Sequence, residues 1–302
     1  MKPEHRGAVV ALGNFDGLHR GHQAVIAQAK SIADNTGARL GLAMFSPHPK
    51  RFFRPDSPPF SLMSARIRAD ILPGLGVSVC YEIPFDAALR DMNDTEFFEQ
   101  VLHRGLGISH LVVGEDFGFG KNRCGDVDSL RRLCRAHGTG LGTVAPVGLH
   151  ELYGKFGSTE IRDAIRNGNV FHAAHVLSRP WTVDGVVTHG DRIGRTIGYP
   201  TANIAYGDHI RPKKGIYCVE VRLSDDPDWY PAVASSGIRP TVGGTEERLE
   251  VHILDFDRDI YGQHADVRFR SFIRPEEKFD TVGAMQKQIA RDVLGARAVF
   301  SI

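Results

Sequence analysis

The sequence has 302 residues, more than a single hydrophobic core usually organises, so we expect two domains. Its 37 Lys and Arg against 36 Asp and Glu leave a net charge of +1, which offers no overall positive field for a nucleic-acid backbone. No apolar run approaches the roughly 20 residues of a membrane-spanning helix and none near the start forms a signal-peptide core, so we expect a cytoplasmic protein without a membrane anchor.

The first half alternates short β-branched runs with longer amphipathic segments, a pattern typical of parallel strands joined by helices. It begins with a predicted strand at residues 8–12, a helix at residues 19–34 that stops at Gly37, and a strand at residues 39–45. The next elements are a helix capped by Asn93 or Asp94 and running to Leu106, a strand at 110–113, a helix capped by Asp126 and reaching His137, and a strand at 142–147. The pattern predicts a doubly wound parallel sheet.

The composition changes around residues 177–180. The following hundred or so residues hold short β-rich runs broken by Gly, Pro and Asp, which predicts a small antiparallel β-barrel. A closing helix over residues 281–294 places Met285, Ile289 and Val293 on one face that can pack against the barrel. We therefore expect one domain over residues 1–177 and a second over residues 178–302.

The segment GNFDGLHRGH, Gly13 to His22, lies between the first predicted strand and the first predicted helix, where open α/β sheets bind ligands. His19, Gly21 and His22 form an HxGH element at the helix start, where free N–H groups and the helix dipole favour phosphate. Gly21 leaves room for a nucleotide, and the two imidazoles can donate hydrogen bonds to a phosphoryl group that gains charge.

Other interpretations of this segment are a capped surface helix or a pair of zinc ligands. Zinc is disfavoured because no cysteine and no third clustered histidine lies nearby in the sequence. Dehydrogenase-type dinucleotide binding is disfavoured because the turn contains no GxGxxG.

Five segments occur along the chain in one order: GNFDGLHRGH, FSPHP (45–49), GEDFGFG (114–120), RCGD (123–126) and STEIR (158–162). In this order they resemble the prokaryotic bifunctional riboflavin kinase/FAD synthetases. The resemblance implies an N-terminal nucleotidyltransferase domain of the HxGH type that adenylylates FMN to FAD with ATP and releases pyrophosphate.

The same resemblance implies site residues in the N-terminal half. Those implied for ATP and its phosphates are Gly13, Asn14, Phe15, Asp16, His19, Gly21, His22, Ser158, Thr159 and Arg162, with His19, His22 and Arg162 catalytic. Those implied for the flavin are Asn14, Asp16, His48, Asp116, Arg123 and Asp126.

Ser158 can cap a helix that starts at Thr159 and carries Arg162 one turn in, which makes an anion site, although an ordinary capping motif is the simpler interpretation of these residues alone. The family commonly shows a hydroxyl residue where this chain has Gly157.

A second glycine-rich segment, HGDRIGRTIGYPTAN, spans residues 189–203. Its glycines let the backbone approach phosphates, and Thr201 and Asn203 offer oxygens suited to Mg²⁺; the alternative is a glycine-rich turn of the barrel. The segment lacks a Walker A loop. It resembles the flavokinase signature GRxxGxPTAN, and the likeness continues through KKGIY (213–217), GIRPTVGG (237–244), LEVHILDF (249–256), DIYG (259–262) and RPEEKFD (274–280).

This second likeness implies that the C-terminal domain phosphorylates riboflavin to FMN, with Glu250 as the general base and with Mg²⁺ and ATP held by Thr201 and Asn203. The remaining residues implied for the ATP phosphates are Gly190, Gly194, Arg195 and Gly198. From strand alternation alone, the preferred interpretation of Glu250 is an outward-facing residue that shares its strand face with His252 and Leu254. The chain departs from the family at Ser235 and Ser236, where relatives usually carry Asn and an aliphatic residue.

The expected partners are riboflavin, FMN, FAD, ATP and Mg²⁺, with no nucleic acid and no membrane, in a monomer or weak homo-oligomer. A flavin-binding regulatory protein with a decayed catalytic site is the main alternative, and the presence of His22, Arg162, Thr201, Asn203 and Glu250 argues against it. A transferase for another vitamin phosphate is a further alternative, which only the kinase motifs disfavour.

Overall fold

The computed structural model describes residues 3–148, 156–189, 194, 197–241 and 244–302. The chain forms two compact units, of which the first comprises Met1–Ser57 and Arg68–Gly157 and the second comprises Pro58–Ile67 and Ser158–Ile302. A short segment from the first half of the sequence thus belongs to the second unit. The domain boundary expected after residue 177 stays a prediction. It concerns which residues each of the two domains needs.

The first unit is built on a five-stranded parallel sheet in the order β3-β2-β1-β4-β5. Its central strand β1 is buried at every position, as expected of a parallel strand covered on both faces. The strands are β1 (Val9–Leu12), β2 (Leu40–Ser46), β3 (Val79–Pro84), β4 (His110–Gly114) and β5 (Gly140–Val144).

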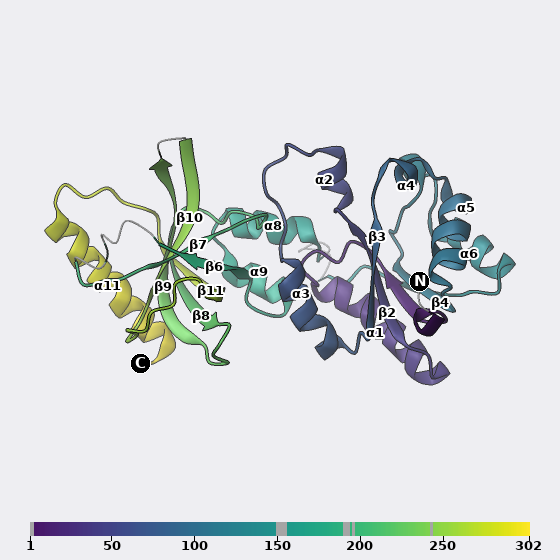
Figure 1. The fold of residues 1–302 in the computed structure, drawn as a ribbon, viewed down its shortest axis with the longest axis horizontal. Coiled ribbons are helices and arrows are strands. Elements are labelled where there is room, and N and C mark those ends of the chain that lie inside the picture. The colour runs from purple at the N-terminus through teal and green to yellow at the C-terminus, as the bar shows by residue number, and fades with distance from the viewer. Residues whose placement is uncertain (1–2, 149–155, 190–193, 195–196, 242–243) are drawn as a thin grey trace. The chain divides into compact units, whose positions relative to one another are not determined.

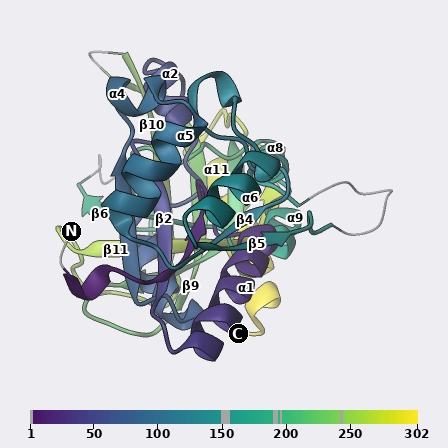
Figure 2. The ribbon, with the colours of Figure 1, turned by 90° about the vertical axis from the view of Figure 1, so that its right-hand side faces the viewer.

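Helices cover both faces of this sheet. On one face α1 (Arg20–Thr36) packs Val25, Ile26 and Ala29 against the strands. On the other face an apolar cluster joins Val10 and Leu12 to residues of α4 (Ala87–Asp91), the π-helix η3 (Phe97–Leu106) and α6 (Val127–Ala136). Figure 1 shows α1 and α6 on opposite sides of the strands, and Figure 2 shows α4, α5 and α6 in front of them. The predicted doubly wound sheet is confirmed.

The predicted helix ends are largely those observed. Gly37 ends α1 in the left-handed conformation, Asn93 caps the helical stretch that runs to Leu106, and Asp126 caps α6. Strand β5 begins and ends earlier than expected, because its first residue pairs with the first residue of β4 and its last residue pairs with the last. The remaining short helices are η1 (Pro3–His5), α2 (Pro49–Phe53), α3 (Ala65–Ile71), η2 (Leu72–Leu75), α5 (Asp94–Glu96) and η4 (Lys121–Arg123).

The second unit is a closed antiparallel barrel in the order β10-β7-β6-β11-β8-β9, as predicted. Its strands are β6 (Thr182–Thr188), β7 (Ala202–Ala205), β8 (Gly215–Leu223), β9 (Tyr230–Thr241), β10 (Gly244–Ile253) and β11 (His264–Arg274). The closing helix α11 (Val282–Phe300) packs on β8 and β9 through Val293 and Ala296, and it runs further than predicted. Helices α8 (Ser158–Arg166) and α9 (Val170–Leu177) pack on each other, and α9 contacts β11.

The short segment Pro58–Ile67 is fastened to the barrel by polar contacts. The indole N–H of Trp181 donates to the carbonyl of Leu62 at 3.1 Å, and the Arg66 guanidinium pairs with Asp184 at 3.1 Å and also with Asp266. The side chains of Asp184 and Asp266 are 5% and 6% exposed. None of the described helices is long and apolar enough to cross a membrane.

Candidate active sites

The turn between β1 and α1 holds its residues in an unusual backbone conformation. Phe15, Gly17 and Leu18 have positive φ angles of 48°, 90° and 46°. Such angles are strained for residues other than glycine and persist only where the surroundings hold them, as they do here because Phe15 and Leu18 are 1% and 0% exposed. His19 follows this turn as the N-cap of α1, and Asp16 lies within the turn and is 9% exposed.

His19 is the N-cap of α1. Its Nδ1 accepts a hydrogen bond from the His22 backbone N–H at 3.3 Å, and the two imidazole rings stack with centroids 3.6 Å apart. Phe15 supports His22 at 5.1 Å between ring centroids. A Cβ at Gly21 would lie 3.1 Å from the His19 ring, so glycine permits this stacking. Both imidazoles therefore lie at the positive end of the helix dipole, where phosphate is favoured.

The other predicted residues of this half follow neighbouring strands of the sheet. His48 follows β2 and caps α2, accepting from the Lys50 N–H at 3.1 Å, while Asp116 follows β4, the neighbour of β1 on its other side. The carboxyl ends of parallel strands share one edge of a sheet, the edge at which Gly13 and Asn14 also leave β1.

The loop after β4 carries two further predicted residues. It folds back so that Phe119 and Gly125 exchange backbone hydrogen bonds of 3.0 and 2.9 Å. Arg123 lies against Gly118, where a Cβ would come within 2.9 Å of its guanidinium. Asp126 accepts from the Ser129 N–H at 2.8 Å, so its carboxylate serves as the cap of α6.

Ser158, Thr159 and Arg162 lie on α8, which belongs to the second unit. There the Arg162 Nε donates to the Phe60 carbonyl at 2.9 Å, and the guanidinium lies 5.4 Å from the centre of the Phe60 ring. Arg162 therefore also holds the segment Pro58–Ile67 in place.

In the second unit, the strand register aligns three polar residues across neighbouring strands. Glu250 on β10 lies directly opposite Asn203 on β7 and directly opposite Ser235 on β9, so the three side chains share one face of the sheet. Asn203 is 3% exposed, and its Oδ1 has no hydrogen-bond partner among the described residues. Glu250 and Ser235 are half-buried.

Two described glycines before β7, Gly194 and Gly198, lie in close backbone surroundings or unusual backbone conformations. The N–H of Tyr199 donates to the Gly194 carbonyl at 2.8 Å, and a Cβ at Gly194 would overlap the Tyr199 carbonyl oxygen. Gly198 has a φ of 87°, a conformation that favours glycine. The next residues are held by His252, whose Nδ1 is 2.8 Å from the Pro200 carbonyl oxygen. The predicted residues Gly190 and Arg195 lie outside the described residues.

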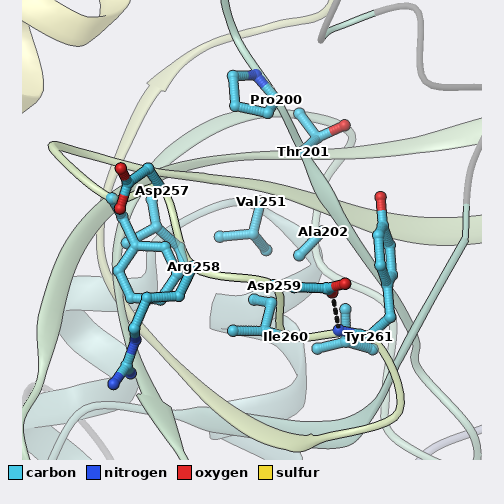
Figure 3. Close-up of a pocket in the computed structure, with 12 residues that line it drawn as sticks. Pro200, Thr201, Ala202, Val251, Asp257, Arg258, Asp259, Ile260 and Tyr261 are labelled. Atoms are coloured by element: carbon cyan, nitrogen blue, oxygen red, sulfur yellow. Dashed lines mark hydrogen bonds between the residues drawn. The ribbon is translucent and has the colours of Figure 1, made fainter.

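A pocket of about 320 Å³ lies on the opposite face of β10 from Glu250. Its apolar walls come from β6, β7 and β10, and Thr201 and the loop from Phe256 to Tyr261 surround it. Figure 3 shows Pro200 and Thr201 on one side of the pocket and Ile260 on the other. In the loop, the Tyr261 N–H donates to Asp259 at 3.1 Å. The sequence did not predict that this loop forms a wall of a pocket, although the DIYG segment within it belongs to the flavokinase likeness.

The serine at position 236, where relatives usually carry an aliphatic residue, has a structural explanation. The buried hydroxyl of Tyr206 donates to the Ser236 Oγ at 2.7 Å, so the serine supplies the partner that a buried phenol requires. Burial raises the pKa of Tyr206 far above its usual range, and the hydroxyl therefore stays a donor.

Comparison with known proteins assigns the two halves of the chain to two families. A family model described as FAD synthetase matches residues 1–159, and one described as riboflavin kinase matches residues 177–300. A curated relative from Pseudomonas fluorescens, a bifunctional riboflavin kinase/FMN adenylyltransferase, is 38% identical over 300 residues, which cover 99% of this chain and 95% of the relative. The chain belongs to this bifunctional family.

The enzyme of the same name from Escherichia coli K12 is 36% identical, with 98% of this chain and 94% of the relative covered. A crystal structure named as a macrolide-efflux protein from Streptococcus pneumoniae is similar with a TM-score of 0.88 and 33% identity, covering 98% of this chain and 95% of that one. As a member of the family, the chain is a riboflavin kinase and an FMN adenylyltransferase, with the first activity in its C-terminal half and the second in its N-terminal half.

Proposed function

We propose that Glu250 is the general base of the riboflavin kinase reaction and that Thr201 and Asn203 hold the metal-bound nucleotide. In this reaction the terminal ribityl hydroxyl of riboflavin attacks the γ-phosphorus of ATP, its proton passes to the Glu250 carboxylate, and ADP leaves. The single observation that carries the proposal is the register that sets Glu250 beside the buried amide of Asn203.

We propose that the nucleotide base occupies the pocket beside Thr201 and that its phosphates extend past Thr201 to Asn203, which shares the face of Glu250. The pocket's volume of about 320 Å³ lies at the lower end of the range of small-ligand pockets, about 300 to 1,000 Å³. Val187, Val251 and Ile253 offer apolar surface to a planar base, and Thr201 lies where the pocket meets the glycine-rich turn. Gly194 and Gly198 let that turn approach the phosphates, and we propose that Gly190 and Arg195 also bind the phosphates.

The residues present fit Mg²⁺. The Oδ1 of Asn203 is a buried carbonyl oxygen with no partner among the described residues, and such an oxygen is a suitable ligand for a hard cation. Thr201, two residues before Asn203 in the sequence, offers a hydroxyl as a second oxygen ligand. When bound, Mg²⁺ neutralises phosphate charge and orients the nucleotide.

For the adenylyltransferase we propose catalysis by orientation and charge stabilisation. A phosphate oxygen of FMN attacks the α-phosphorus of ATP and pyrophosphate leaves, while the imidazoles of His19 and His22 donate hydrogen bonds to the phosphate oxygens. The other residues that we propose for this site are Gly13, Asn14, Phe15, Asp16, Gly21, His48, Asp116, Arg123, Asp126, Ser158, Thr159 and Arg162.

The test of the kinase proposal is the variant Glu250→Gln in the full chain. We expect it to bind riboflavin, measured by quenching of flavin fluorescence, and to lose FMN formation by at least about 100-fold, because the amide keeps the shape and removes the base. Asn203→Ala should raise the Mg²⁺ concentration required for half-maximal FMN formation. Normal turnover by Glu250→Gln would remove Glu250 from the mechanism, and an unchanged Mg²⁺ requirement would remove Asn203.

The setting that we propose is the cytoplasm, because both reactions consume ATP and the four cysteines are free. We also propose that the kinase activity requires residues 178–302 and the adenylyltransferase residues 1–177, in a monomer or weak homo-oligomer.

A further inference from the structure

Ser235 and Asn203 both lie next to Glu250, on the two neighbouring strands. The two residues flank Glu250 directly, one on each neighbouring strand, in the order Asn203, Glu250, Ser235 across the barrel wall. Directly opposed residues in antiparallel strands have Cβ atoms about 4.5 to 5.5 Å apart, so a serine hydroxyl can reach a glutamate carboxylate. No hydrogen bond among the described residues uses the Ser235 hydroxyl or the Glu250 carboxylate.

The next residue of the strand, Ser236, points to the opposite face and has a different environment. It is 4% exposed, and its hydroxyl accepts the hydrogen bond of Tyr206. Consecutive serines thus lie on opposite sides of β9, one in the interior and one beside the proposed base. Substitutions at the two serines can therefore distinguish a structural role, at Ser236, from a role in the reaction, at Ser235.

A glutamate on a half-exposed strand face can adopt several staggered rotamers, of which only some direct its carboxylate toward a substrate hydroxyl. We propose that Ser235 is a positioning residue of the riboflavin kinase reaction, whose hydroxyl donates a hydrogen bond to one carboxylate oxygen of Glu250 when substrates are bound and leaves the other to accept the ribityl proton. The inference rests on the proposed role of Glu250 as the base. It assigns a function to the first of the two serines.

The test compares Ser235→Thr with Ser235→Val in the full chain, because the two side chains have nearly the same shape and only threonine carries a hydroxyl. We expect Ser235→Val to lower the kcat of FMN formation about tenfold with an unchanged KM for ATP, as the loss of one hydrogen bond in the transition state would do. Ser235→Thr, and Ser235→Asn with its N–H donor, should keep kcat within about twofold of wild type. FAD formation from added FMN is the internal control and should not change.

Ser236→Ala is the matched control. Removing the partner of the buried Tyr206 hydroxyl should lower the Tm and leave the kcat of FMN formation unchanged. Equal kcat values for Ser235→Val and Ser235→Thr, whether normal or reduced, would overturn the assignment of Ser235. If Ser235→Val is normal while Glu250→Gln is inactive, only the positioning role fails; an active Glu250→Gln overturns the proposed base itself.

Discussion

At the scale of single residues, His19 combines a structural role with a proposed catalytic one. Its Nδ1 caps α1, while its ring stacks on His22 at the helix start. We expect His19→Ala to lower stability by about 1 kcal/mol through loss of the cap and to lower FAD formation by about 100-fold. His19→Asn should restore stability, because asparagine is a preferred cap, without restoring FAD formation.

Thermal unfolding and the rate of FAD formation from FMN measure the two effects separately. FMN formation from riboflavin is the control and should be unaffected in both variants. Wild-type rates of FAD formation in His19→Asn would show that the imidazole serves only as a cap.

The sequence located the HxGH element but not the way it is held. The predicted helix began at residue 19, whereas His19 precedes the observed helix as its N-cap, a position for which histidine is not among the preferred residues. The pairing of Ser235 with Glu250 was likewise beyond prediction, because side-chain alternation gives the face of a strand and only the register gives its neighbour.

At the scale of elements, the segment Pro58–Ile67 depends on Arg66. Its guanidinium contacts two nearly buried carboxylates, Asp184 and Asp266, which also interact with His209, His264 and Arg222. Asp184, His264 and Asp266 are close enough to hold a cation, and the guanidinium supplies positive charge to this cluster.

We expect Arg66→Met to lower the Tm by several degrees, because it leaves buried carboxylates with fewer partners. Arg166→Met, which breaks the exposed pair with Asp163, is the control and should change the Tm little. Equal Tm values for the two variants would contradict the anchoring role of Arg66.

The same cluster predicts a dependence on acid. Burial alone would raise the pKa of the Asp184 carboxyl, but hydrogen bonds from His209, Ser64 and His264 outweigh it and hold this pKa well below the usual 3.8. A depressed pKa in the folded state means stability that is present above about pH 4 and is lost as the pH falls further. Asp184→Asn should therefore flatten the fall of Tm between about pH 4 and pH 2, and a curve as steep as that of wild type would contradict this.

Patterns local in the sequence predicted the helices and strands better than they predicted which segments pack together. Alternation, capping residues and glycines predicted the parallel sheet, the barrel and the ends of α1 and α6. They did not predict that Pro58–Ile67 joins the second unit, because the bonds that fasten it link residues far apart in the sequence.

At the scale of the whole molecule, a fragment from Arg179 to Ile302 keeps every strand of the barrel and α11. We expect it to fold and to make FMN but not FAD, in line with the matched range of the riboflavin kinase family. Its Tm should lie several degrees below that of the second unit in the full chain, because Trp181 and Asp184 lose their partners Leu62 and Arg66. A folded fragment that binds riboflavin and ATP without forming FMN would refute a self-sufficient kinase domain.

One chain carries two sites whose reactions follow one another. The most direct measurement incubates riboflavin, ATP and Mg²⁺ with full-length His22→Ala, with Glu250→Gln, and with an equimolar mixture, followed by chromatography of the flavins. We expect FMN alone from the first variant, unchanged riboflavin from the second, and FAD from the mixture, because FMN released by one variant is the substrate of the other. FAD from either variant alone, or no FAD from a mixture of folded variants, would contradict two consecutive reactions at two sites.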